Sequence, residues 1–63
     1  MPRIIVDWLE GRSEEVRNEI AKQITNAFVE NANVRPDQVS ICFKDNSPKL
    51  MYKAGKQYAE IEL

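Results

Sequence analysis

The chain has 63 residues, with nine basic and ten acidic side chains, no histidine and a single cysteine. The near balance of charge excludes the strong basic excess that is typical of nucleic-acid-binding proteins. No stretch approaches the roughly 20 apolar residues that cross a bilayer, and Met1-Pro2-Arg3 leads directly into a predicted strand rather than a signal peptide. We therefore predict a cytoplasmic protein with no nucleic-acid or membrane partner.

The small size of the chain predicts self-association. A domain of this length buries only about 60% of its unfolded surface, which gives marginal stability. Cys42 has no partner for an internal disulfide, and a zinc site is not expected without histidine or further thiols. Additional copies of the chain are the remaining source of stability.

The first predicted element is a strand over residues 3–9, which are rich in β-branched and aromatic side chains. Ile4 and Trp8 would lie on one face and Ile5 and Leu9 on the other. Both faces are thus apolar, which favours a strand that is covered on two sides.

A helix is predicted over residues 14–32, where apolar side chains recur at a spacing of three and four. Gly11 supplies a turn before it, and Ser13 is a good N-cap. Asn33 can adopt a left-handed cap, and Pro36 prevents the helix from continuing.

Alternating apolar residues predict a second strand over residues 38–44, followed by turn chemistry at residues 45–48 and a C-terminal hairpin over residues 50–63. The bend of this hairpin is Ala54-Gly55, and residues 58–63 alternate like a short edge strand. The predicted fold class is α+β: a single domain, 1–63, containing a βαβ unit with two parallel strands. Bare sheet edges would let two copies form a dimer with a four-stranded sheet, and further copies would cover the open face.

Most catalytic motifs are missing, which directs attention to Pro2. The sequence has no histidine, no phosphate-binding glycine loop and no serine nucleophile elbow, and we interpret Cys42 as a small buried hydrophobe. Cleavage of Met1 would expose a secondary amine at Pro2. Burial and nearby cations would lower the pKa of that amine toward neutrality, which suits a general base.

The Met1-Pro2 start, the short apolar strand and the segment LEGRSEE at residues 9–15 together resemble the 4-oxalocrotonate tautomerase family. The resemblance covers nearly the whole chain. It implies a βαβ fold, dimers with four-stranded sheets, commonly a hexamer, and no cofactor or metal. It also implies that the N-terminal proline transfers a proton within an enol or unsaturated 2-keto acid.

The resemblance further implies roles for individual residues. Pro2 matches the base, Arg12 the arginine that binds a substrate carboxylate, and the Leu9 amide a group that holds the substrate. The second arginine of well-studied members aligns with Ser40, which brings no charge, and the aromatic wall aligns with Met51.

Three residues near the aligned positions are further candidates for the substrate site. Tyr52 follows Met51 and could provide the aromatic wall, while Arg35 and Lys44 are candidate replacements for the missing cation. Because Arg12 is then the one firm cation, a monoacid such as an arylpyruvate enol is the expected substrate.

Two alternatives are left open. A hydratase or dehalogenase-like lyase of the same superfamily would use a protonated proline and a carboxylate that activates water, for which Asp7 is the candidate. A non-catalytic oligomeric member would explain the loss of the second arginine. If Met1 stays attached, the Pro2 nitrogen is an amide and cannot act as a base.

Overall fold

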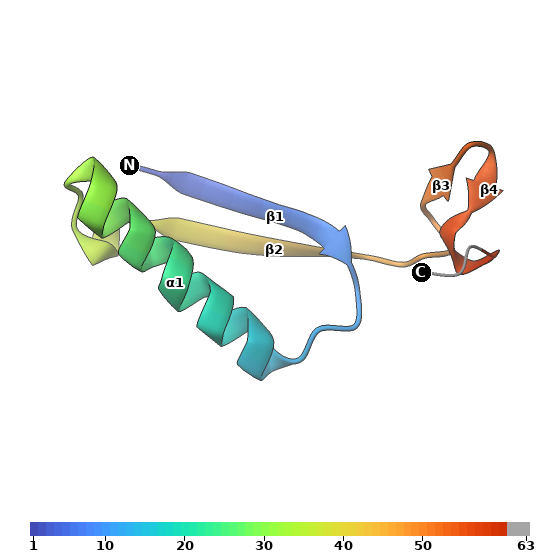
Figure 1. The fold of residues 1–63 in the computed structure, drawn as a ribbon, viewed down its shortest axis with the longest axis horizontal. Coiled ribbons are helices and arrows are strands. Elements are labelled where there is room, and N and C mark those ends of the chain that lie inside the picture. Colours follow the sequence, from blue (N-terminus) through green and yellow to red (C-terminus); the bar gives the residue numbers. More distant parts are fainter. Residues whose placement is uncertain (61–63) are drawn as a thin grey trace.

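The computed structural model describes residues 1–60 and consists of a βαβ unit followed by a projecting C-terminal arm (Figure 1). The predicted fold class, with parallel strands, one long helix and short C-terminal strands, is confirmed. In chain order the elements are strand β1 (Arg3–Leu9), helix α1 (Glu14–Ala32), 3-10 turn η1 (Pro36–Gln38), strand β2 (Ser40–Asn46), strand β3 (Tyr52–Lys53), strand β4 (Lys56–Gln57) and 3-10 turn η2 (Tyr58–Glu60).

Strands β1 and β2 form a parallel two-stranded ladder, with Arg3 opposite Ser40 and Leu9 opposite Asn46. The Ser40 N–H also donates to the carbonyl of Pro2 at 3.0 Å, which extends the ladder by one residue. At about 3.3 Å per residue, Pro2 and Leu9 are roughly 23 Å apart. The ladder therefore has two well-separated ends, which we call the Pro2 end (Pro2, Arg3 and Ser40) and the Arg12 end (Trp8 to Arg12 with Asp45 and Asn46).

The second strand starts and ends two residues later than the predicted range 38–44. Gln38 belongs to η1 instead, because its N–H donates to the Arg35 carbonyl at 3.0 Å and its side chain accepts from the Arg35 N–H at 2.9 Å. Asp45 and Asn46, predicted to be part of a turn, pair with the last residues of β1. Strand β2 therefore continues to Asn46, the residue opposite Leu9 at the end of β1.

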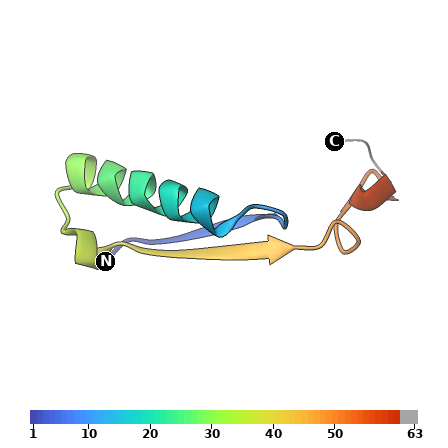
Figure 2. The ribbon, with the colours of Figure 1, turned by 90° about the horizontal axis from the view of Figure 1, so that it is seen from below.

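Helix α1 covers one face of the ladder (Figure 2). The Ser13 hydroxyl accepts from the Val16 N–H at 3.3 Å, so the predicted N-cap is confirmed. At the other end, Asn33 has a φ of 55° and forms the predicted left-handed cap. The helix side chains that are half-buried include Ile20, Ile24 and Phe28, which recur at helical spacing on the side facing the sheet.

The second face of the ladder is open, and the described part of the chain encloses no core by itself. No residue in the range 1–60 is fully buried, and Ile5 on the open face is 58% exposed. The prediction that Cys42 is buried is wrong for the single chain, because strand alternation places it beside Ile5, away from the helix. The radius of gyration is 15.0 Å, compared with about 10.6 Å for a compact chain of this length.

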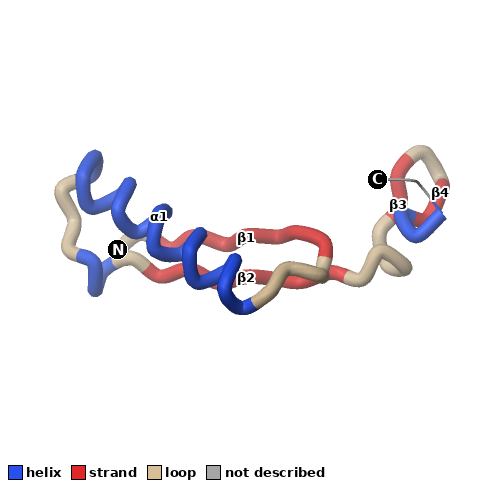
Figure 3. Tube along the Cα trace, turned by 60° about the horizontal axis from the view of Figure 1, so that its bottom comes forward, coloured by secondary structure: helices blue, strands red, loops and turns tan. Residues whose placement is uncertain are grey.

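The C-terminal arm extends beyond the Arg12 end of the ladder (Figures 1 and 3). Ala54 and Gly55, with φ of 54° and 78°, form the predicted bend between β3 and β4. The prediction of a strand is wrong for residues 58–60, which form η2 because the Tyr58 N–H bonds back to the Met51 carbonyl at 2.8 Å. The rest of that prediction, residues 61–63, lies outside the described residues.

Candidate active site

Pro2 opens the ladder and is half-buried. Its carbonyl is fixed by the Ser40 N–H, so the backbone at this position is part of the sheet. Met1 in front of it is 88% exposed, which leaves the Met1–Pro2 bond accessible to a processing enzyme. The last turns of α1 lie near the N-terminus (Figure 1), and four of their residues line a shallow apolar depression: Ala27, Phe28, Asn31 and Ala32.

Arg3 is a residue of the Pro2 end that the sequence analysis missed. The register places it directly opposite Ser40, and cross-strand partners in a ladder share one face. The face is the open one, and Arg3 is exposed there. Sequence reasoning could not find this pairing, because matching the starts of the predicted strands places residue 3 opposite residue 38 rather than opposite Ser40.

The two cations considered earlier lie in less suitable positions. Arg35 forms an ion pair with Asp37 at 3.1 Å, at the start of η1. Lys44 lies opposite Asp7, toward the Arg12 end. Of these three cations, Arg3 is therefore the one that lies directly opposite Ser40 in the ladder.

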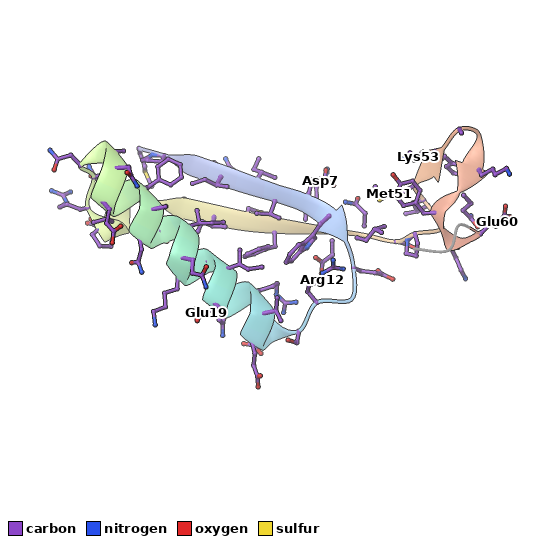
Figure 4. The ribbon with its side chains drawn as sticks, viewed as in Figure 1. Asp7, Arg12, Glu19, Met51, Lys53 and Glu60 are labelled. Atoms are coloured by element: carbon purple, nitrogen blue, oxygen red, sulfur yellow. The ribbon has the colours of Figure 1, made fainter. Side chains whose placement is uncertain are left out.

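Leu9 and Arg12 belong to the other end of the ladder, where Figure 4 shows Arg12. Leu9 is the last residue of β1 and is half-buried. Arg12 follows in the loop before α1, where its guanidinium carbon lies 5.4 Å from the centroid of the Trp8 ring. Its backbone carbonyl accepts from Nη1 of Arg17 at 2.8 Å. A separation of roughly 23 Å along β1 prevents Pro2 and Arg12 of one chain from holding the same small substrate.

Asp7, the candidate water-activating carboxylate, is also far from Pro2. Five residues of extended strand correspond to about 16 Å. The Asn46 side-chain amide donates to the Asp7 carboxylate and, at 3.1 Å, to the Trp8 carbonyl. Asp7 thus has a structural partner at the Arg12 end and does not face Pro2 of its own chain.

Met51 and Tyr52 lie in the C-terminal arm, apart from both ends of the ladder (Figure 4). Met51 is half-buried, and Tyr52 is 64% exposed at the start of β3. The six predicted site residues therefore occupy three separate places within one chain: Pro2 with Ser40, Leu9 with Arg12, and Met51 with Tyr52.

Among residues 1–60, no three histidine, cysteine, aspartate or glutamate side chains come together in a way that could hold a metal ion. The one long helix in the same part of the chain, α1, is too polar to cross a membrane.

Comparison with known proteins decides the family. Residues 2–60 match the model of the tautomerase enzyme family, and the match begins at Pro2. The chain belongs to the tautomerase family. A probable tautomerase of Bradyrhizobium diazoefficiens is 35% identical over 60 residues, which are 95% of this chain and 90% of that relative. The family predicted from the residue 9–15 segment is confirmed.

Solved tautomerases share the fold. A 4-oxalocrotonate tautomerase isozyme of Methylibium petroleiphilum is 36% identical, with a TM-score of 0.84 over 92% of this chain and 91% of that one. A heterohexameric 4-oxalocrotonate tautomerase of Chloroflexus aurantiacus is 26% identical, with a TM-score of 0.87 over 98% and 100% of the two chains. Because these alignments include nearly all of both chains, the βαβ unit and the arm are features that the relatives have as well.

Proposed function

We propose that this tautomerase-family chain catalyses proton transfer within a small 2-keto acid or its enol, with Pro2 as the general base and Arg12 as the carboxylate-binding group. The observation that carries the proposal is that the family match begins at Pro2, which leads directly into β1 behind one exposed residue. Removal of Met1 would convert the Pro2 amide into a secondary amine. That amine would take the enol O–H proton and deliver a proton to carbon, so the keto product forms without net gain or loss of atoms.

The proposed site is assembled from more than one copy of the chain. Arg12 can grip a carboxylate with two parallel hydrogen bonds, but only at a distance from the Pro2 of its own chain. Pro2 of one copy would therefore act on a substrate held by Leu9 and Arg12 of another. The open sheet face, the bare strand edges and the missing core support a dimer-based homo-oligomer, for which we propose a hexamer.

The remaining predicted residues complete the substrate pocket in this proposal. Ser40 can donate a hydrogen bond to the substrate's keto oxygen, and Arg3 opposite it adds the positive charge that a hydroxyl lacks. The arm would bring Met51 and Tyr52 to a neighbouring copy as an apolar wall, which is supported by the exposure of Tyr52 in the isolated chain.

The test is ketonisation of phenylenolpyruvate and of 2-hydroxymuconate by protein whose loss of Met1 is verified by intact mass. Pro2→Ala should reduce kcat/KM by at least about 100-fold, the usual contribution of a general base. Pro36→Ala, which removes a proline from η1 in the α1–β2 connection, is the matched control and should keep its activity. Full activity in Pro2→Ala would exclude the proline as the base.

A further inference from the structure

The indole of Trp8 is held by two side chains of the neighbouring strand. Its Nε1–H donates to Oδ1 of Asp45 at 2.5 Å. Its ring stacks on Phe43, with centroids 5.1 Å apart and an angle of 28° between the planes. A hydrogen bond at the edge and a stacked partner at the face together restrict both the position and the rotation of the ring.

Arg12 rests on this fixed indole. Its guanidinium carbon, 5.4 Å from the ring centroid, lies within the roughly 6 Å range of a cation–π interaction, which is strongest with tryptophan. The donation of the Trp8 N–H to a carboxylate increases the electron density of the ring. The backbone of Arg12 is fixed separately, because its carbonyl accepts from Arg17 of helix α1 at 2.8 Å.

Such an arrangement leaves the binding edge of Arg12 free. A guanidinium that contacts an aromatic ring keeps its N–H donors available in its own plane, where a carboxylate is bound through two hydrogen bonds. Within residues 1–60, the ion pair that forms is between Arg35 and Asp37, and no acidic side chain pairs with the Arg12 guanidinium. The arginine is thus oriented in advance without being neutralised.

We propose that Trp8 is a positioning residue that orients Arg12 for a substrate carboxylate, and that Asp45 and Phe43 hold Trp8 for this task. The inference rests on the proposed role of Arg12. Orientation lowers the entropy that a long, exposed arginine side chain would lose on binding an acid. Acidic ligands would therefore be bound less tightly without the indole, while proton transfer at Pro2 would proceed as before.

Binding can be followed directly, because Trp8 is the only tryptophan of the chain. Indole emission responds to charge and polarity next to the ring, so hexanoate should produce a saturable change in the emission of the wild-type protein. Hexanol, which has the same chain length without the carboxylate, should produce none. The saturable change should be lost in Arg12→Gln. An identical hexanoate response in Arg12→Gln would overturn the coupling between the two side chains.

Kinetics separate positioning from structure. Trp8→Leu should raise KM for phenylenolpyruvate about two- to fivefold, the equivalent of one cation–π contact, with kcat and the pH profile unchanged. Trp8→Phe retains a ring and should lie closer to wild type. Val6→Ala, on the same face of β1 two residues before Trp8, is the control for loss of packing and should leave KM unchanged. A wild-type KM in Trp8→Leu would overturn the proposal.

The outcomes distinguish this inference from the proposed function. If Arg12→Gln neither weakens hexanoate binding nor raises KM, then Arg12 does not bind the carboxylate, and both proposals about it fail. If Arg12→Gln weakens binding but Trp8→Leu does not, then Arg12 keeps its role and the positioning role of Trp8 alone is wrong.

Discussion

The two ends of the β1–β2 ladder differ in how far a single chain completes them. At the Arg12 end, side chains from β1, β2 and the following loop contact one another: Trp8 bonds to Asp45 and lies under Arg12, and Asn46 bonds to Asp7. At the Pro2 end, the contact across the strands is the backbone hydrogen bond from Ser40, and Arg3 beside it is exposed.

This difference indicates which part of the proposed site depends on the association of subunits. The Arg12 end is ordered by contacts within one chain, so its arrangement does not require a second subunit. The Pro2 end is only half-buried in the single chain, and the proposed association would enclose it, which would strengthen electrostatic contacts there. We therefore expect an isolated chain to retain a binding arginine and to lack a working base.

The most demanding test of this division is complementation between two inactive variants. At substrate concentrations below the wild-type KM, Pro2→Ala and Arg12→Ala are each expected to retain only a small part of the wild-type rate. If each site takes its proline from one copy and its arginine from another, random 1:1 mixing after denaturation and refolding should restore activity in about a quarter of the sites. Recovery of kcat/KM is measured on phenylenolpyruvate.

Two controls accompany the mixing experiment. Light scattering should give each variant a mass well above the 7.3 kDa of one chain, and a monodisperse monomer would refute the oligomer. Mixing Pro2→Ala with wild-type protein gives the dilution expected without complementation. Mixtures of the two variants that stay inactive would mean that proline and arginine do not act across copies.

A smaller effect is expected from Arg12→Ala examined alone over a range of substrate concentrations. Hydrogen bonds to a charged group contribute about 1.5–3 kcal/mol, which corresponds to roughly 10- to 100-fold in KM. The KM for acidic substrates should rise accordingly, while the midpoint of urea unfolding shifts little because the guanidinium is exposed. Arg35→Ala, an exposed arginine outside the proposed site, should leave KM unchanged. An unaltered KM in Arg12→Ala would remove its binding role.

Local rules predicted those parts of the fold that the local sequence determines. The hydroxyl of Ser13 and the left-handed conformation of Asn33 define the ends of α1, and both could be read from residue type. The ends of β2 could not be predicted in this way, because a glutamine at position 38 fits a strand and the turn η1 equally well. Gln38 belongs to η1 because it forms hydrogen bonds with the backbone of Arg35, and these bonds exist only in the folded loop. Cys42 was assigned to the interior because alternation alone does not say which sheet face the helix covers.

The candidate site shows the same limit. Pro2 and Arg12 could be selected from the sequence through the family segment, yet their separation follows from the extended strand β1 between them, which Pro2 precedes and Arg12 follows. Arg3 was overlooked because its significance depends on the register that pairs it with Ser40. Trp8 was placed on an apolar face of the first strand by its spacing, and its contact with Arg12 depends on the path of the loop after β1.

The smallest predicted effect concerns the less complete, Pro2 end. Arg3→Gln should lower kcat/KM by up to about fivefold, since exposed charge pairs contribute at most about 1 kcal/mol. Because Arg3 and Ser40 are paired and lie on the same face, the double variant Arg3→Gln/Ser40→Arg should return the charge to the same place and restore the rate.

Ser40→Arg by itself should improve turnover of the dicarboxylate 2-hydroxymuconate more than that of phenylenolpyruvate. Lys44→Gln removes a cation on the same face toward the other end, and its activity should match wild type. If Lys44→Gln and Arg3→Gln lose equal activity, the site responds to overall charge rather than to a cation beside the proline, and the two ends are less distinct than the ladder indicates.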